Sequence, residues 1–186
     1  MNSTFRIRGR RQTAYTLAEF GPTLLIAFCI IILPVLAFGM VGARYMFLLN
    51  AAREAAQSAA RAKTFLTDIS PTDRSAVHIA QAAAQVAINA IGGGMVSLTS
   101  TTTYIKICPN GGGPAAVTTP GANTALSAPA DPNNNTYSCE VICSGTIQPL
   151  FPGAPSMAGS LQGFNAPIVT TVRSDCFFEN VSNLNQ

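Results

Sequence analysis

Charged side chains are scarce in this sequence, and tryptophan is missing altogether. Only 10% of the 186 residues are Asp, Glu, Lys or Arg, whereas 48% are hydrophobic. Four arginines lie before residue 12, and from Tyr15 onward seven Lys and Arg stand against eight Asp and Glu. A nucleic-acid-binding surface needs a dense basic patch. The composition therefore argues against nucleic acid as a partner.

Histidine is equally rare, because His78 is the only one. No second histidine and no Cys or Ser partner stands at a diagnostic spacing from it, so we interpret His78 as an ordinary residue of a helix face. With one histidine and few acids, the sequence assembles no pair of nucleophile and base. We expect neither an enzyme nor a bound cofactor.

Metal-ligand spacings are also missing. Cys139 and Cys143 are further apart than the two cysteines of a zinc-binding CxxC pair. Acidic and amide side chains alternate over 131–135 as at the start of a calcium loop, but Thr136 stands where glycine is needed and Ile142 where glutamate is needed. We predict no metal site.

What the sequence does contain is a long uncharged run. Phe20 to Ala43 is 24 residues without a charge, and as a helix it spans about 36 Å, enough for a hydrocarbon core of about 30 Å. The arginines ahead of the run outnumber Arg44 behind it, so we expect the N-terminus to stay in the cytoplasm. A cleaved secretory signal peptide is the alternative, but its apolar region is shorter, about 7–15 residues.

The helical pattern continues past this run. Residues 43–66 contain no Gly or Pro and are rich in Ala, so we predict one helix over 15–66, kinked or locally unwound at Pro22 and Pro34. Its small side chains form a stripe that packs either against the chain's own domain or against helices of neighbouring subunits. The stripe includes Gly39, Gly42, Ala52, Ala55 and Ala59.

The remaining residues, 67–186, are expected to form one small exported α+β domain. Ser70, Pro71 and Asp73 resemble a helix start, and the glycines at 92–94 end that helix. Three β-rich segments follow, and we expect them to form a short antiparallel sheet. These segments are 95–107, 137–147 and 168–176.

Four of the five cysteines lie in this exported region. An even number there predicts two disulfides, with three possible connectivities. Cys108 and Cys139 flank a long loop rich in Gly, Pro and Asn, so a bond between them would restrict it. The pairing is left open among Cys108, Cys139, Cys143 and Cys176.

The junction between the basic leader and the apolar run carries a motif. "A-YTLAEF", residues 14–20, resembles the processing site of type IV prepilins, which a prepilin peptidase cuts at the cytoplasmic face. The resemblance places the cut between Ala14 and Tyr15, although the family usually has Gly where Ala14 stands. It makes Glu19 the carboxylate that meets the Tyr15 ammonium of a neighbouring subunit. A carboxylate at such a position otherwise costs about 2.5–3.5 kcal/mol.

A finer resemblance extends over the first third of the chain. The "EF" entry, the apolar span with its proline and the block "AAREAA" at 51–56 resemble TadE-like minor pilins and pseudopilins of the tight-adherence (Tad) pilus system. The resemblance implies a structural subunit, processed after residue 14, whose partners are other pilin subunits, the peptidase and the inner-membrane assembly platform. The alternative is an uncleaved single-pass membrane anchor that carries an extracytoplasmic binding module.

Overall fold

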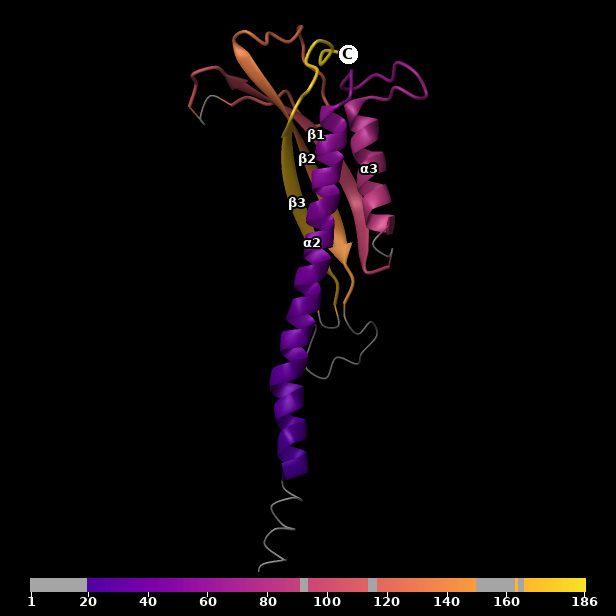
Figure 1. Cartoon of the computed structure of the whole chain (residues 1–186), viewed down its shortest axis with the longest axis vertical. Helices are drawn as coiled ribbons and strands as arrows, with labels where there is room; N and C mark the ends of the chain where they lie inside the picture. Colours follow the sequence, from indigo (N-terminus) through magenta and orange to yellow (C-terminus); the bar gives the residue numbers. More distant parts are fainter. Residues whose placement is uncertain (1–19, 91–93, 114–116, 150–162, 164–165) are drawn as a thin grey trace, which may run out of the picture. The chain divides into compact units, whose positions relative to one another are not determined.

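The computed structural model describes residues 20–90, 94–113, 117–149, 163 and 166–186. These residues form one long apolar helix, a second helix and a three-stranded antiparallel sheet, so the chain is α+β (Figure 1). The chain divides into two units, Met1–Met40 and Val41–Gln186. The elements are η1 (Phe28–Ile32), α2 (Leu33–Ala60), α3 (Ala76–Ala90), β1 (Val96–Pro109), β2 (Asn135–Ile147) and β3 (Ile168–Phe177).

The long helix runs from Phe20 to Ala60. The expected N-terminal part, 15–19, lies outside the described residues, and the expectation that the helix reaches Leu66 is wrong. At its C-terminal end the backbone tightens, and the carbonyl of Ala60 accepts a hydrogen bond from the Glu179 N–H at 3.0 Å. The turn that follows allows Phe65 to be fully buried, which a continuing helix would not provide.

A π-helical segment, η1, ends at Ile32, two residues before Pro34. Proline has no N–H, and its ring clashes with the carbonyl four residues earlier, which belongs to Ile30. A π segment shifts the local pairing by one residue and accommodates such a break. Of the two expectations for Pro34, a kink or a local unwinding, the structure shows the second, as a π segment over Phe28–Ile32.

Helix α3 begins later than the sequence predicted. Ser70 caps a turn instead: its Oγ accepts a hydrogen bond from the Asp73 N–H at 3.0 Å, and Ser70 and Asp73 also exchange backbone hydrogen bonds. The helix starts at Ala76, with Ser75 as the capping residue whose Oγ accepts from the His78 N–H at 3.5 Å. Both serines offer the same local chemistry, and the helix forms after the second one.

The sheet has the order β1-β2-β3, with both pairs antiparallel. Each strand matches its predicted segment to within two residues at either end. In β1, an irregularity between Leu98 and Ser100 interrupts the pairing with β2. β2 is the central strand, with a neighbouring strand on each side, and eight of its residues are buried.

Both helices pack on one face of the sheet, as Figure 1 shows. The helical side of this core consists mainly of alanines, which allow close approach. Leu48 is the largest buried side chain of α2 and lies against Gly145 of β2. A Cβ at Gly145 would lie 2.9 Å from the Ser97 carbonyl and 3.0 Å from the Leu48 side chain. The absence of a side chain at Gly145 therefore lets α2 approach the sheet.

Candidate functional site

The residues that carry the processing motif, Ala14, Tyr15 and Glu19, lie outside the described residues. The structure begins at Phe20, directly after them. The candidate site is therefore built from the helix surface that follows the motif, and from the polar groups of the C-terminal unit.

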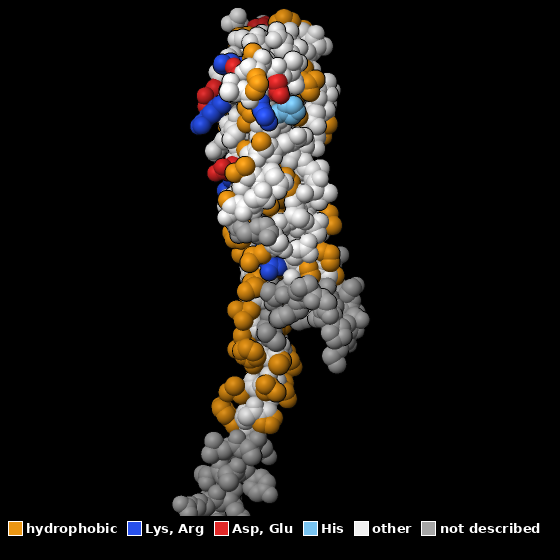
Figure 2. Space-filling view, turned by 90° about the vertical axis from the view of Figure 1, so that its right-hand side faces the viewer, with side chains coloured by type: hydrophobic (Ala, Val, Ile, Leu, Met, Phe, Trp, Pro, Cys, Tyr) orange, Lys and Arg blue, Asp and Glu red, His pale blue; other side chains and the backbone are white. Residues whose placement is uncertain are grey.

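The helix surface between residues 20 and 40 is apolar and exposed. The large side chains most open to solvent are Phe38 at 76%, Ile30 at 68% and Val35 at 65%. Figure 2 shows apolar side chains over the visible face of this segment. We call this surface the anchor surface; it also includes Phe20, Leu24, Leu25, Ile26, Phe28, Ile31, Ile32, Leu36 and Met40. The helix is long and apolar enough to cross a membrane.

The small-residue stripe splits into two parts. Ala52, Ala55 and Ala59 are fully buried in the domain core, so these three pack against the chain's own domain. Gly39 and Gly42 differ, because a Cβ at either would have nothing within 4 Å. Of the five stripe residues, only the two glycines lie open to a neighbouring helix.

Arg44 is the first charge after the anchor surface. Its guanidinium donates a hydrogen bond to the backbone carbonyl of Gln148, which follows β2. The side chain is half-buried. Arg44 is thus fixed to the domain by a charged donor, the stronger class of hydrogen bond.

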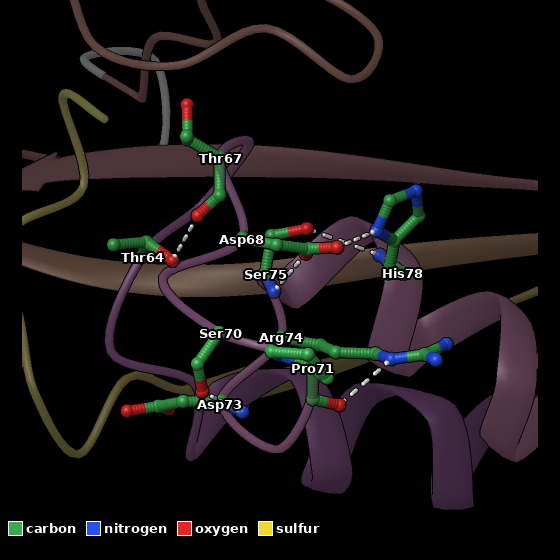
Figure 3. Close-up of polar contacts among 9 residues, drawn as sticks. All are labelled: Thr64, Thr67, Asp68, Ser70, Pro71, Asp73, Arg74, Ser75 and His78. Atoms are coloured by element: carbon green, nitrogen blue, oxygen red, sulfur yellow. Dashed lines mark hydrogen bonds and ion pairs between the residues drawn. The ribbon is translucent and has the colours of Figure 1, made fainter.

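Asp68 organises the loop before α3 (Figure 3). Its Oδ1 accepts the Ser75 N–H at 2.7 Å, and its Oδ2 lies 2.7 Å from Nδ1 of His78. The hydrogen bond from the Ser75 backbone is the largest effect and lowers the pKa of Asp68. Burial, the next largest, opposes it, and the hydrogen bond from His78 lowers the pKa further. Sequence analysis gave His78 no partner, because no local pattern indicates a carboxylate ten residues earlier.

The chemistry of this group is that of a helix cap. Ser75 Oγ is buried and hydrogen-bonds the backbone N–H of His78 rather than its ring. Ser75, His78 and Asp68 therefore lie together, but the serine hydroxyl does not hydrogen-bond the histidine ring. Nucleophilic catalysis by such a group needs that hydrogen bond. An open hollow of about 900 Å³ lies beside them and is also lined by Arg74, Gln81 and Gln85.

A second charged group lies on the sheet face opposite the helices. Lys106 Nζ lies 3.0 Å from Glu140 Oε1 and 2.8 Å from Asp175 Oδ2. Burial alone would lower the pKa of Lys106, but hydrogen bonds to the two carboxylates outweigh it and raise the pKa. The three residues come from β1, β2 and β3, one from each, so this cluster joins all three strands.

The four C-terminal cysteines all lie in the sheet, and all five cysteines of the chain are thiols in this structure. Cys139 and Cys176 stand directly opposite each other on β2 and β3. Cys108 stands opposite Thr136, so the structure does not bring Cys108 and Cys139 together. Cys143 is buried, and burial raises the pKa of its thiol.

Asp131 explains the alternating segment that resembled a calcium loop. Its carboxylate accepts the Asn133 N–H at 3.1 Å and the Asn134 side-chain amide at 2.7 Å. These bonds, led by that from Asn134, lower the pKa of Asp131. Within the described ranges, no three His, Cys, Asp or Glu side chains gather as a metal-binding group.

Comparisons of the chain with known protein families, with curated proteins and with solved structures found no match.

Proposed function

We propose that the chain is a structural subunit, a TadE-like minor pilin or pseudopilin, of a tight-adherence pilus used in surface attachment. In this proposal the precursor enters the inner membrane with its arginines in the cytoplasm. A prepilin peptidase cuts between Ala14 and Tyr15, and the helix then enters the pilus or pseudopilus. The domain 67–186 faces the periplasm or the exterior.

The observation that carries this proposal is that the two parts of one helix have different surroundings. Its first part presents the anchor surface, and its last part, from Leu48, lies in the domain core. A subunit that waits in a membrane and then assembles needs an apolar helix without polar interruptions, covalently continuous with a folded domain. The "YTLAEF" motif at 15–20 stands immediately before such a helix.

Glu19 has a defined role in the proposal. An unpaired carboxylate near hydrocarbon costs about 2.5–3.5 kcal/mol. Cleavage creates an ammonium at Tyr15, and the ammonium of one subunit compensates the Glu19 carboxylate of the next. Such a buried ion pair also fixes the axial register between subunits, as buried polar pairs do in coiled coils.

The first experiment is to determine the N-terminus and intact mass of the protein from membranes and from sheared filaments. A start at Tyr15 is the expected result and means prepilin-type processing. A start at Met1 would instead favour the uncleaved membrane anchor, which the anchor surface alone also supports. A start near Met40 would indicate a secreted domain and contradict both.

A matched pair of variants then separates a filament subunit from a plain anchor. Glu19→Gln removes the carboxylate at the membrane threshold, and we expect the variant to stay in membranes but to be lost from sheared filaments. Glu54→Gln is the control, because Glu54 lies exposed on the same helix within the domain. If the Glu19 variant assembled as well as the control, the proposed role of Glu19 would be wrong.

A further inference from the structure

The strand register fixes the distances between the four cysteines of the sheet. Cys139 of β2 and Cys176 of β3 are direct partners in the antiparallel pairing, whereas Cys108 and Cys143 stand opposite Thr136 and Val172. Residues directly opposite each other lie on the same face of a sheet. Cys139 and Cys176 therefore share the face that carries the core.

The backbone spacing at this pair suits a disulfide. The Phe178 N–H donates to the Tyr137 carbonyl at 3.2 Å, and that position is two residues along from Cys139. The cysteines therefore occupy a hydrogen-bonded position of the ladder, where Cα atoms are about 5.5 Å apart. Disulfides bridge Cα separations of roughly 4.4–6.8 Å, most often about 5.5–6 Å. We propose that Cys139 and Cys176 form a disulfide that fastens β3 to β2, and that Cys108 and Cys143 remain thiols.

Pairings with Cys108 fail on distance. Thr136, its partner on β2, lies three residues from Cys139, which is about 10 Å along a strand. The separation from Cys176 is larger, because β2 lies between them and adds two strand spacings of about 4.8 Å. Cys108 and Cys176 do line one hollow of about 470 Å³, but their backbones are too far apart for a bond.

Pairings with Cys143 fail in the same way. Cys143 lies four residues from Cys139 on the same strand, and its partner Val172 lies four residues from Cys176. Either offset is about 13 Å along a strand. On β1 its partner is Thr101, seven residues from Cys108, so that pair is more than 20 Å apart by the same spacing. Only Cys139 and Cys176 come within reach of each other.

The two thiols differ in accessibility, which sets the order of the steps. Cys176 is half-buried, whereas Cys139 is fully buried, and burial, with a smaller contribution from Cys176, raises the pKa of Cys139 to about 12. Cys176 therefore reacts first: its thiol loses a proton to water and its sulfur attacks an external disulfide R–S–S–R, which forms Cys176–S–S–R and releases one R–S⁻; the second R–S⁻, released in the next step, takes up that proton. Cys139 then gives its proton to the first R–S⁻ and attacks the Cys176 sulfur, which releases the second R–S⁻. The external disulfide is reduced to two thiols, and two protein thiols are oxidised.

The bond would hold an edge strand. β3 pairs with β2 alone among the described strands, and it carries Asp175 of the three-strand charge cluster. Fastening Cys176 fixes the end of β3 that lies beside Asp175. The inference is independent of the proposed function, because it depends only on the register and on exposure to a disulfide oxidant.

Peptide mapping of the full chain tests the inference. Protein from membranes is trapped with N-ethylmaleimide under denaturing conditions without reductant, and a second sample is first equilibrated with oxidised glutathione. We expect label on Cys29, Cys108 and Cys143 only, and label on all five cysteines after reduction. Cleavage after Lys106, Glu140 and Arg173 and before Asp131 then separates Cys108, Cys139, Cys143 and Cys176 onto different peptides.

The expected product is a link between peptide 131–140 and the peptide that carries Cys176. A link that involves Cys108 or Cys143, or complete labelling of all five cysteines in the glutathione-treated sample, would overturn the inference. Two single variants provide a matched comparison. Cys176→Ser should free Cys139 for labelling, whereas Cys143→Ser should leave the link intact. Should Cys176→Ser fail to fold, the mapping of the unaltered chain still decides the pairing.

Discussion

The first and last parts of the long helix are both apolar, yet the first exposes large side chains and the last buries small ones. Residues 20–40 carry Phe, Ile, Leu and Val, most of them more than half exposed. From Leu48 to Ala60 the helix packs a row of alanines against the core, and six of these alanines are at most 1% exposed. The sequence alone predicted one stripe of small side chains, from Gly39 to Ala59, that extends from one part into the other.

The difference shows that side-chain size, more than hydrophobicity, distinguishes the part of the helix that is apolar enough to cross a membrane from the part that packs in the core. Lipid surrounds a helix on every side and accepts bulky side chains. A helix laid close on a sheet must fit a fixed gap, and alanine fills such a gap without strain. The contrast between Phe38 at 76% exposure and Ala55 at 0% therefore predicts opposite responses to the same mutation.

The largest expected effect comes from placing a carboxylate in each part. Leu48→Asp buries an unpaired charge in the core, and we expect the free energy of unfolding of the unit Val41–Gln186 to fall by about 4 kcal/mol or more. Leu36→Asp meets no core, because Leu36 is 53% exposed. That variant should keep its unfolding curve in detergent. Its membrane association should weaken, because a carboxylate raises the free energy of insertion by about 2.5–3.5 kcal/mol.

Urea unfolding in detergent and membrane fractionation measure the two effects separately. Equal loss of folding in both variants would mean that the anchor surface belongs to a packed core and would remove the contrast. Leu36→Ala and Leu48→Ala serve as controls for loss of the leucine without a charge.

A smaller effect is expected from enlarging small residues. Ala55→Leu overfills the core, and we expect a loss of about 1–3 kcal/mol in the free energy of unfolding. Gly42→Ala adds a methyl into open space, so the helix should gain about 0.5–1 kcal/mol. If the Gly42 surface contacts a neighbouring subunit, the same variant should assemble less well while folding better. A folding loss at Gly42 would contradict its open surroundings.

The smallest effect is expected from acid, and only the domain should respond. The pKa of Asp68 and that of Asp131 are lowered in the folded protein, so folding stability from these groups is complete above the unfolded value of about 4. It is lost as the pH falls through the lower folded values, because the unfolded chain binds the protons first. Asp68→Asn combined with Asp131→Asn should flatten the acid limb of a stability–pH curve measured by urea unfolding. An unchanged limb would show that neither carboxylate is linked to folding.

Residues 20–43 contain no acidic or basic side chain, so membrane association of the Glu19→Gln variant, which lacks the carboxylate beside this segment, should not change over the same pH range. A parallel fractionation at each pH is the control for this prediction.

The strands were predictable because alternation and β-branched residues identify them locally. The start of α3 was not, since Ser70 and Ser75 both carry capping chemistry and the choice depends on Asp68 bonding the Ser75 N–H. The early end of the long helix likewise depends on Glu179, which lies far away in the sequence. Tertiary partners of this kind leave no local pattern.

The same limit applies to the candidate site. The apolar run is local and was readable from the sequence. The processing motif is also local, but Ala14, Tyr15 and Glu19 lie outside the described residues, so it stays a prediction. The cysteine pairing was not, because the loop-flanking position of Cys108 and Cys139 suggested a bond that the register does not allow. The cluster of Lys106 with Glu140 and Asp175 depends on the same register, and no spacing in the sequence indicates it.

The π segment over Phe28–Ile32 has a consequence for any helix that lies alongside. One extra residue in a turn rotates the angular phase of everything beyond it by about 100°. A line of side chains drawn at the usual period from Leu24 therefore does not continue to Gly39. A straight helix that packs along this one contacts two different faces of it, one before the π segment and one after it. Its contacts must form two short patches rather than a single seam.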